Sequence, residues 1–95
     1  QAEVYIYEDD RGILGFAGVM DGYIAVIFVK ENMRSQGIGK ALTDFCKEKY
    51  PKLTLHVYCE NKKAIAFYER EGFVIEKEQT DGNTGEKEYE MVWQA

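Results

Sequence analysis

Apolar and polar side chains alternate along this chain with two different periods, and each change of period marks a new element. Strict alternation, as in residues 2–8, is typical of strands. Apolar side chains at positions i, i+3, i+4 and i+7, as in residues 37–50, are typical of an amphipathic helix. In chain order, the expected elements are strands 2–8, 13–20 and 23–29, helix 37–50, strand 52–58, helix 62–71, and strands 73–80 and 87–93.

Turn and cap residues support these boundaries. Asp21-Gly22 is a dipeptide typical of a two-residue type I′ hairpin turn. Pro51 ends the first helix, Asn61 suits the N-cap of the second, and Gly72 suits the position just after its last turn. The two helices therefore have chemical signals at their ends as well as periodicity.

The first three strands are expected to form an antiparallel unit. Gly15 and Gly18 in the second strand suggest a β-bulge or a close approach of backbones. Residues 23–29 are almost continuously apolar, so we expect both faces of this strand to be covered.

The order strand–strand–strand–helix–strand–helix–strand–strand predicts a mixed α/β (α+β) fold in a single domain, residues 1–95. The strand–helix–strand step through residues 23–58 is expected to be a right-handed crossover between parallel strands. The last two strands flank residues 81–86 and are expected to form a hairpin.

Composition narrows the classes of function. With 17 acidic and 12 basic residues the formal net charge is −5, which argues against a nucleic-acid surface and tolerates a cationic partner. No apolar run approaches the ~20 residues that a membrane span needs. Cys46 and Cys59 lack the spacing of a metal or redox site. We therefore expect a cytoplasmic protein without a metal, in which both cysteines pack as small apolar side chains.

The richest local chemistry lies where the third strand runs into the first helix. Gly37 and Gly39 let the backbone approach a ligand, and the start of a helix presents N–H groups and a partial positive charge. Arg34 and Lys40 add full charges, so the segment suits a phosphate or pyrophosphate. The simpler alternative is a glycine-rich turn before a helix. A P-loop is excluded because position 34 would have to be glycine.

A second set of candidates follows the strand over residues 52–58. His56 can act as a base near neutral pH, although a lone strand histidine is more often structural. Glu60 stands at a strand end, where a carboxylate can be catalytic or simply exposed. Tyr68 on the second helix has Ala64 and Ile65 on its own face, so packing against these neighbours is its simplest role.

These two segments together carry a family resemblance. The motif R-x-x-G-x-G, from Arg34 to Gly39, resembles the acyl-CoA loop of the GNAT N-acetyltransferases. The pattern N-x-x-A-I-x-x-Y-x-x-x-G-F, from Asn61 to Phe73, resembles the second half of the same family. The resemblance extends over residues 2–93 and is greatest to small bacterial members related to the ribosomal-protein N-terminal acetylases. It implies a GNAT-like mixed, mostly antiparallel sheet.

The resemblance also implies a site for acetyl-CoA as co-substrate. The loop that holds the pyrophosphate would comprise Arg34, Ser35, Gln36, Gly37, Ile38, Gly39 and Lys40. The pantetheine arm would pair with the strand that ends at Phe28 and Val29, and would be lined by Asn61, Ala64 and Phe67. Strands 23–29 and 52–58 would splay apart to admit it.

Catalysis would then be direct attack of a neutral primary amine on acetyl-CoA. Tyr68 would be the general acid for the departing thiolate, because a phenol of pKa ~10 can hydrogen-bond or protonate a thiolate of pKa ~8.5. An alkylamine is mostly protonated at pH 7, so a base or a water relay is expected. His56 is one candidate, Glu60 acting through water is another, and an unassisted amine is the third.

The chain departs from the family picture at its N-terminus. The family fold usually begins with a further strand and one or two helices, which form a wall of the acceptor pocket. We expect this chain to be a fragment, a unit completed by a partner chain, or a reduced CoA-binding unit. The absent layer would leave an apolar sheet face uncovered, which we expect to favour a homodimer.

Three hypotheses follow. The first is a CoA-dependent N-acetyltransferase acting on an amine of a small molecule or a protein. The second is a non-catalytic acyl-CoA-binding or regulatory module, and the third is a purely structural domain. Binding of acetyl-CoA separates the third from the others, and release of CoA with an amine separates the first from the second.

Overall fold

The computed structural model describes residues 2–33 and 37–95. The expected strands and helices are all confirmed, with ends that shift by at most one residue, and one 3₁₀ turn is added. In chain order the elements are β1 (Ala2–Asp9), β2 (Gly12–Met20), β3 (Tyr23–Val29), η1 (Glu31–Met33), α1 (Ile38–Lys49), β4 (Lys52–Tyr58), α2 (Lys62–Arg70), β5 (Val74–Thr80) and β6 (Lys87–Gln94).

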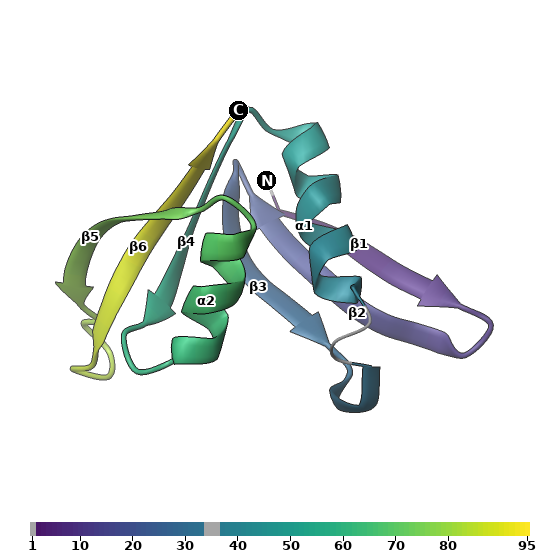
Figure 1. Ribbon diagram of the computed structural model, residues 1–95, viewed down its shortest axis with the longest axis horizontal. Helices are drawn as coiled ribbons and strands as arrows, with labels where there is room; N and C mark the ends of the chain where they lie inside the picture. The colour runs from purple at the N-terminus through teal and green to yellow at the C-terminus, as the bar shows by residue number, and fades with distance from the viewer. Residues whose placement is uncertain (1, 34–36) are drawn as a thin grey trace.

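The strands form one sheet in the order β1-β2-β3-β4-β6-β5 (Figure 1). Strands β1, β2 and β3 are antiparallel, as are β4, β6 and β5, and the two halves meet at the parallel pair β3 and β4. This confirms the predicted mixed, mostly antiparallel sheet, the antiparallel first unit and the hairpin of β5 and β6.

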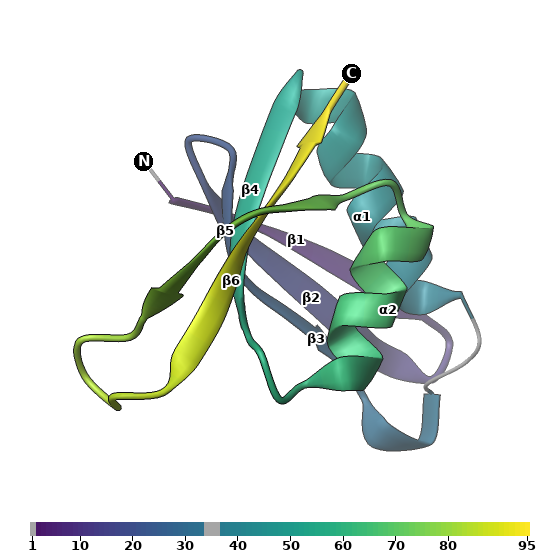
Figure 2. The same ribbon diagram turned by 60° about the vertical axis from the view of Figure 1, so that its left-hand side comes forward.

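Both helices pack on the same face of the sheet (Figure 2). Helix α1 buries Ile38, Leu42 and Cys46 against the sheet, and α2 buries Ile65. The buried sheet residues that meet them include Leu14, Ala17, Val19, Ile24, Leu53, Leu55, Val57 and Met91. Burial of these side chains is the main contribution to stability, at roughly 25 cal/mol per Å² of apolar surface.

Local chemistry sets the predicted turns and caps. Asp21 and Gly22 both have positive φ angles, of 51° and 83°, as a type I′ turn requires. The Asn61 side chain accepts a hydrogen bond from the backbone N–H of Ala64 at 3.3 Å, so Asn61 caps α2 as expected. At the other end, Gly72 has a φ of 93° and its N–H donates to Glu69, a bond of the Schellman motif.

A β-bulge in β3 changes which side chains face the helices. Gly18 pairs with Val26 while Val19 pairs with Ile24, so Ala25 is the extra residue. The alternation therefore restarts at Ala25, and Ile24 and Ile27 both point towards the helices. The bulge predicted for the second strand is also present: Tyr7 pairs with Gly15 while Glu8 pairs with Ile13, so Leu14 of β2 is an extra residue beside Gly15.

The expectation that both faces of residues 23–29 are covered was wrong. Val26 and Phe28 keep 44% and 46% of their surface exposed. Part of the continuous apolar run comes from the bulge, which lets neighbouring apolar residues share a face. The rest belongs to an uncovered face, hereafter the open face, whose members share the sheet side away from the helices: Val4, Ile6, Phe16, Val26 and Phe28.

Candidate active site

The site begins where β3 and β4 separate. The two strands pair at only two positions, Tyr23 with Thr54 and Ile24 with Leu55. Beyond them β3 stays with β2, and β4 stays with β6, so the strands diverge and α2 lies over the opening (Figure 1). The bulge at Ala25 sits at the position where pairing stops, and bulges commonly end pairing in this way.

A cavity of about 520 Å³ fills this opening. Its wall includes Leu55 and Val57, which face the helices, and His56 and Tyr58, which face the opposite side of the sheet. The cavity therefore passes between the strands from one face of the sheet to the other. A ligand on the helix side can meet a second ligand that enters from the open side.

Helix α2 supplies one wall of the cavity through Asn61, Ala64 and Tyr68. Ala64 and Tyr68 are four residues apart and so lie on one side of the helix. The Tyr68 ring packs edge-on against Phe73, with 5.6 Å between ring centroids, and burial raises the pKa of its phenol. None of the described residues hydrogen-bonds the Tyr68 hydroxyl, so a protonated phenol is held with its donor free.

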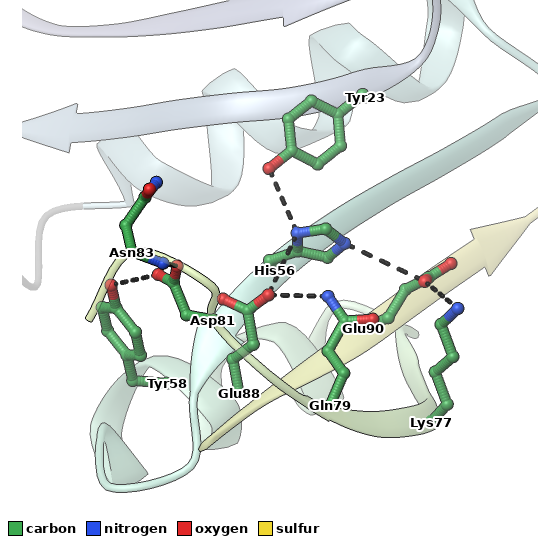
Figure 3. A network of polar contacts seen from close by, with 9 residues as sticks. All are labelled: Tyr23, His56, Tyr58, Lys77, Gln79, Asp81, Asn83, Glu88 and Glu90. Carbon is green, nitrogen blue, oxygen red and sulfur yellow. Dashed lines mark hydrogen bonds and ion pairs between the residues drawn. The ribbon is translucent and has the colours of Figure 1, made fainter. Parts of the chain in front are cut away.

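His56 lies at the centre of a polar network on the other side of the sheet (Figure 3). Its Nδ1 is 3.4 Å from the hydroxyl of Tyr23 and 3.5 Å from Oε2 of Glu88. Its Nε2 is 3.9 Å from Oε1 of Glu90, which in turn pairs with Lys77 at 3.5 Å. The cavity-facing neighbours of the ring are therefore Tyr23 and Glu88 on its Nδ1 side.

The β5–β6 hairpin is tied to the rim of the cavity. The Tyr58 hydroxyl donates to Oδ2 of Asp81 at 2.8 Å, and the backbone N–H of Asn83 donates to Oδ1 at 2.8 Å. These two donors, the Asn83 N–H first, lower the pKa of the Asp81 carboxyl. Asp81 is thus held as a carboxylate beside the opening.

The start of α1 lies next to the same opening. Gly37 is the N-cap, with a φ of 79°, and the ladder of the helix begins with the N–H of Ala41 donating to its carbonyl at 2.9 Å. A Cβ on Gly39 would lie 3.3 Å from Cζ of Phe67 and 3.8 Å from a methyl group of Val29. Glycine at this position thus lets the end of β3, the start of α1 and α2 come together.

The ammonium of Lys40 forms two ion pairs at the protein surface. Its Nζ lies 3.3 Å from Oε1 of Glu71 and 3.5 Å from Oδ2 of Asp44, and the bond to Glu71 is the main reason why the pKa of Lys40 is raised. Glu71 caps α2, and Lys47 of α1 also donates to its carbonyl oxygen. Lys40 therefore links the two helices as well as standing beside the helix start.

Other predicted site residues have different positions. Arg34, Ser35 and Gln36 lie outside the described residues. Phe28 points to the open face, stacks on Phe16 with centroids 5.4 Å apart, and is not part of the cavity wall. Glu60 is exposed in the turn before α2 and is not part of the cavity wall. Ile38 is buried in the core.

Sequence reasoning missed four polar residues of the cavity wall, which are Tyr23, Tyr58, Asp81 and Glu88. Alternation placed His56 and Tyr58 on one face, which was the available signal for Tyr58. The contribution of Glu88 depends on the register of β4 with β6, where Tyr58 pairs with Glu88 and His56 with Glu90. The strands are far apart in the sequence, so its local pattern carries no information on that register.

Within residues 2–33 and 37–95 there is no group of three or more side chains that could hold a metal ion. None of the helices in those residues is long and apolar enough to cross a membrane. Cys46 and Cys59 are free, the first buried in the core and the second partly exposed in the turn after β4.

Both the sequence and the fold of this chain match known acetyltransferases. A family model described as an acetyltransferase (GNAT) domain matches residues 1–75. The peptidyl-lysine N-acetyltransferase YiaC of Escherichia coli strain K12 is 40% identical over 75 residues, which cover 78% of this chain and 51% of that protein. This chain belongs to the GNAT acetyltransferase family.

Solved structures agree with this assignment. A streptothricin acetyltransferase from Bacillus anthracis strain Ames, in complex with acetyl coenzyme A, superimposes with a TM-score of 0.83 at 27% identity, covering 97% of this chain and 61% of that one. The apo form of YjaB from Escherichia coli superimposes with a TM-score of 0.85 at 20% identity, covering 95% of this chain and 63% of that one, and shows the shared fold. The chain spans about half the length of the curated relatives that it matches.

Proposed function

We propose that the protein transfers an acetyl group from acetyl-CoA to a primary amine. The observation that carries the proposal is the cavity that crosses the sheet between β3 and β4. Tyr68 from the helix side and His56 from the open side both line this cavity. A donor and an acceptor of the acetyl group can therefore meet there from opposite faces.

The residues around the opening fit acetyl-CoA. Past Ile24, the backbone of β3 towards Val29 has a free edge on the side of β4, which suits the amide groups of the pantetheine arm. The start of α1 offers first-turn N–H groups and a glycine-lined approach to a pyrophosphate. We assign the pyrophosphate to residues 34–40 and the pantetheine arm to Asn61, Ala64 and Phe67.

Acetyl-CoA supplies a thioester carbonyl that an amine can attack. A protonated acceptor has no lone pair, so one N–H bond of its ammonium must break, and we assign that proton to His56. The amine loses a second proton when the amide forms, and one proton ends on the departing sulfur. We assign Tyr68 as the donor of the proton that the sulfur receives, because a raised pKa keeps the phenol of Tyr68 protonated at neutral pH. Two protons leave the amine, and one is returned to solvent.

His56 is preferred to Glu60 as the base because of their positions. His56 lines the cavity and is within reach of two polar groups there. Glu60 is exposed in the turn before α2 and would have to act through a chain of water molecules. An unassisted amine stays the third alternative, and His56→Gln distinguishes it because that variant would then keep its full rate.

The acceptor is proposed to be a cationic primary amine, such as a lysine side chain of a protein or a small polyamine. Asp81 and Glu88 add negative charge to the cavity wall, and the whole chain has a formal net charge of −5. The relative YiaC is named as a peptidyl-lysine N-acetyltransferase, which favours a lysine. We place this reaction in the cytoplasm, where free thiols such as those of Cys46 and Cys59 persist.

We also infer that residues 1–95 act as one acyltransferase domain and that the open face binds a second copy. Val4 and Val26 flank Gly18, and Ile6 and Phe28 flank Phe16, so apolar groups cover three adjacent strands. Apolar patches of this kind commonly mark protein–protein contacts.

The proposal is tested by following release of the CoA thiol from acetyl-CoA with a panel of a lysine peptide, spermidine and a peptide with a free N-terminus. Release that needs an amine supports the transferase. Binding of acetyl-CoA without release for any amine would favour the alternative, a non-catalytic acyl-CoA-binding or regulatory module. A folded sample that neither binds acetyl-CoA nor releases CoA with any amine would contradict the proposal.

A further inference from the structure

Two glutamates of β6 flank the ring of His56, and they differ in the charges around them (Figure 3). Glu90 lies 3.9 Å from Nε2 and also 3.5 Å from the ammonium of Lys77, so a cation already balances its charge. Glu88 lies 3.5 Å from Nδ1, and its other partner is the neutral amide of Gln79 at 2.7 Å. Glu88 is therefore the glutamate whose negative charge is available to stabilise a protonated imidazole.

Burial strengthens the case for Glu88. It is 9% exposed and lines the cavity, whereas Glu90 is not part of the cavity wall. A carboxylate held in such surroundings interacts more strongly with a nearby positive charge than one in water does. The bond from Gln79 fixes the carboxylate, so Oε2 stays on the Nδ1 side of the ring.

Tyr23 completes the surroundings of Nδ1. Its hydroxyl lies 3.4 Å from that nitrogen, and burial followed by the charge of Glu88 raises the pKa of Tyr23. The phenol therefore stays neutral near pH 7 and competes with Glu88 only as a hydrogen-bond partner. The described groups facing the ring are thus Tyr23 from β3 and Glu88 and Glu90 from β6, with Lys77 of β5 behind Glu90.

We propose that Glu88 is a positioning residue for His56 in acetyl transfer, and that its carboxylate stabilises the imidazolium once Nδ1 has taken the proton and then accepts a hydrogen bond from the new Nδ1–H. This inference rests on the proposed function, in which His56 takes a proton from the acceptor. In that step an N–H bond of the ammonium breaks and the Nδ1–H bond forms, while the amine keeps the electron pair. The positive charge moves onto the ring, next to the carboxylate of Glu88.

The matched variants Glu88→Gln and Glu90→Gln each remove one negative charge beside the ring. For the wild type and both variants, kcat and KM are measured for acetyl-CoA and for a lysine peptide. We expect Glu88→Gln to lower kcat at least about tenfold, a fraction of what a general base contributes, with KM for acetyl-CoA changed by less than about twofold. We expect Glu90→Gln to stay within about threefold of the wild type. Equal effects of the two variants would overturn the inference.

A double-mutant cycle shows whether Glu88 acts through His56. In the His56→Gln background, Glu88→Gln should have no further effect on kcat, because the residue that it positions is gone. Additive losses would contradict the inference. If Glu88→Gln does not fold, Gln79→Leu replaces it. That variant removes the hydrogen bond that fixes the carboxylate and should lower kcat in the same direction by a smaller factor.

A readout without turnover separates this inference from the proposed function. His56 is the single histidine of the chain, so its ring nitrogens are unambiguous in ¹⁵N NMR spectra. Glu88→Gln should shift the Nδ1 resonance more than the Nε2 resonance, and Glu90→Gln should do the reverse. A ring unaffected by Glu88→Gln overturns the inference even in an active enzyme. A ring that responds in a chain without turnover supports the contact and refutes the proposed function instead.

Discussion

At the scale of single residues, the surroundings of each side chain decide its chemistry more than its type does. The chain has seven tyrosines, and the structure assigns different tasks to three of those around the cavity. Tyr58 donates to Asp81 and holds a loop, and Tyr23 lies against His56. Tyr68 is the most buried of these three, and none of the described residues hydrogen-bonds its hydroxyl, as a proton donor to a ligand requires.

Tyr68→Phe tests that assignment directly. The variant removes the hydroxyl and keeps the ring that packs on Phe73, so the fold should be retained. We expect kcat to fall by about 10²-fold or more, the contribution typical of general acid catalysis, with little change in the Kd for acetyl-CoA. Stopped-flow measurement of CoA release together with calorimetry of cofactor binding checks both parts. An unchanged kcat would exclude Tyr68 as the acid.

The Asp81 carboxyl gives a prediction on pH and stability. Its pKa is lowered in the folded state from the ordinary value of 3.8, so the unfolded chain binds the proton more readily. The carboxylate therefore contributes stability above pH 3.8, and this contribution is lost as the pH falls through the lower folded value. Urea unfolding from pH 6 down to about pH 3 should show the wild type losing its advantage over Asp81→Asn.

Tyr58→Phe serves as the control for that series. It removes the second cause of the lowered pKa and leaves the first, the N–H of Asn83. The pH dependence should therefore be reduced only in part. If Asp81→Asn and the wild type lose stability in parallel as the pH falls, the carboxylate is not responsible.

At the scale of elements, the local sequence predicts where strands and helices lie, but it does not predict how the strands pair. The bulge in β3 is an example of the second kind of feature. Periodicity and caps place all eight main elements, because the side chains follow a strand or helix period and turn or cap residues such as Gly22, Pro51 and Asn61 mark several of the ends. The position of the bulge at Ala25 depends on how β3 pairs with β2, and no local pattern reports that pairing. The same limit applies to Glu88, which reaches the site through the register of β4 with β6.

The turn between β2 and β3 gives a stability prediction for this scale. Gly22 has a φ of 83°, and a Cβ there would lie 2.8 Å from the carbonyl oxygen of Lys52. Gly85 has a φ of 74° with nothing within 4 Å of its Cβ position. Gly85→Ala should therefore lower the free energy of unfolding by about 1 kcal/mol, which is the penalty for an alanine in the left-handed conformation. Gly22→Ala should cost about 1–3 kcal/mol more because the backbone of β4 must move. Urea unfolding measures both, and equal losses would contradict the close approach.

At the scale of the whole molecule, one face of the sheet is covered by two helices and the other exposes apolar side chains over β1, β2 and β3. Ile6 is 53% exposed on the part of this open face that belongs to the edge strand β1.

If a second copy covers the open face, Ile6→Lys should convert a dimer into a monomer, because a charged side chain would be buried in the interface. Ile75→Lys is the matched control, since Ile75 is 42% exposed on β5, at the other edge of the sheet. Sedimentation velocity should show dimers for the wild type and the control. A monomeric wild type, or two variants that both remain dimers, would refute the homodimer.

The central claim is that the start of α1 and the opening between β3 and β4 bind acetyl-CoA. The most direct measurement is calorimetric titration of acetyl-CoA into the wild type, Gly39→Glu and Gly82→Glu, with circular dichroism to confirm folding. Gly39→Glu places a carboxylate and added bulk beside Phe67 at the helix start, whereas Gly82→Glu adds the same group where nothing lies within 4 Å. We predict micromolar binding by the wild type and Gly82→Glu, and none by Gly39→Glu. Absence of binding in a folded wild type, or equal binding by both variants, would contradict the account.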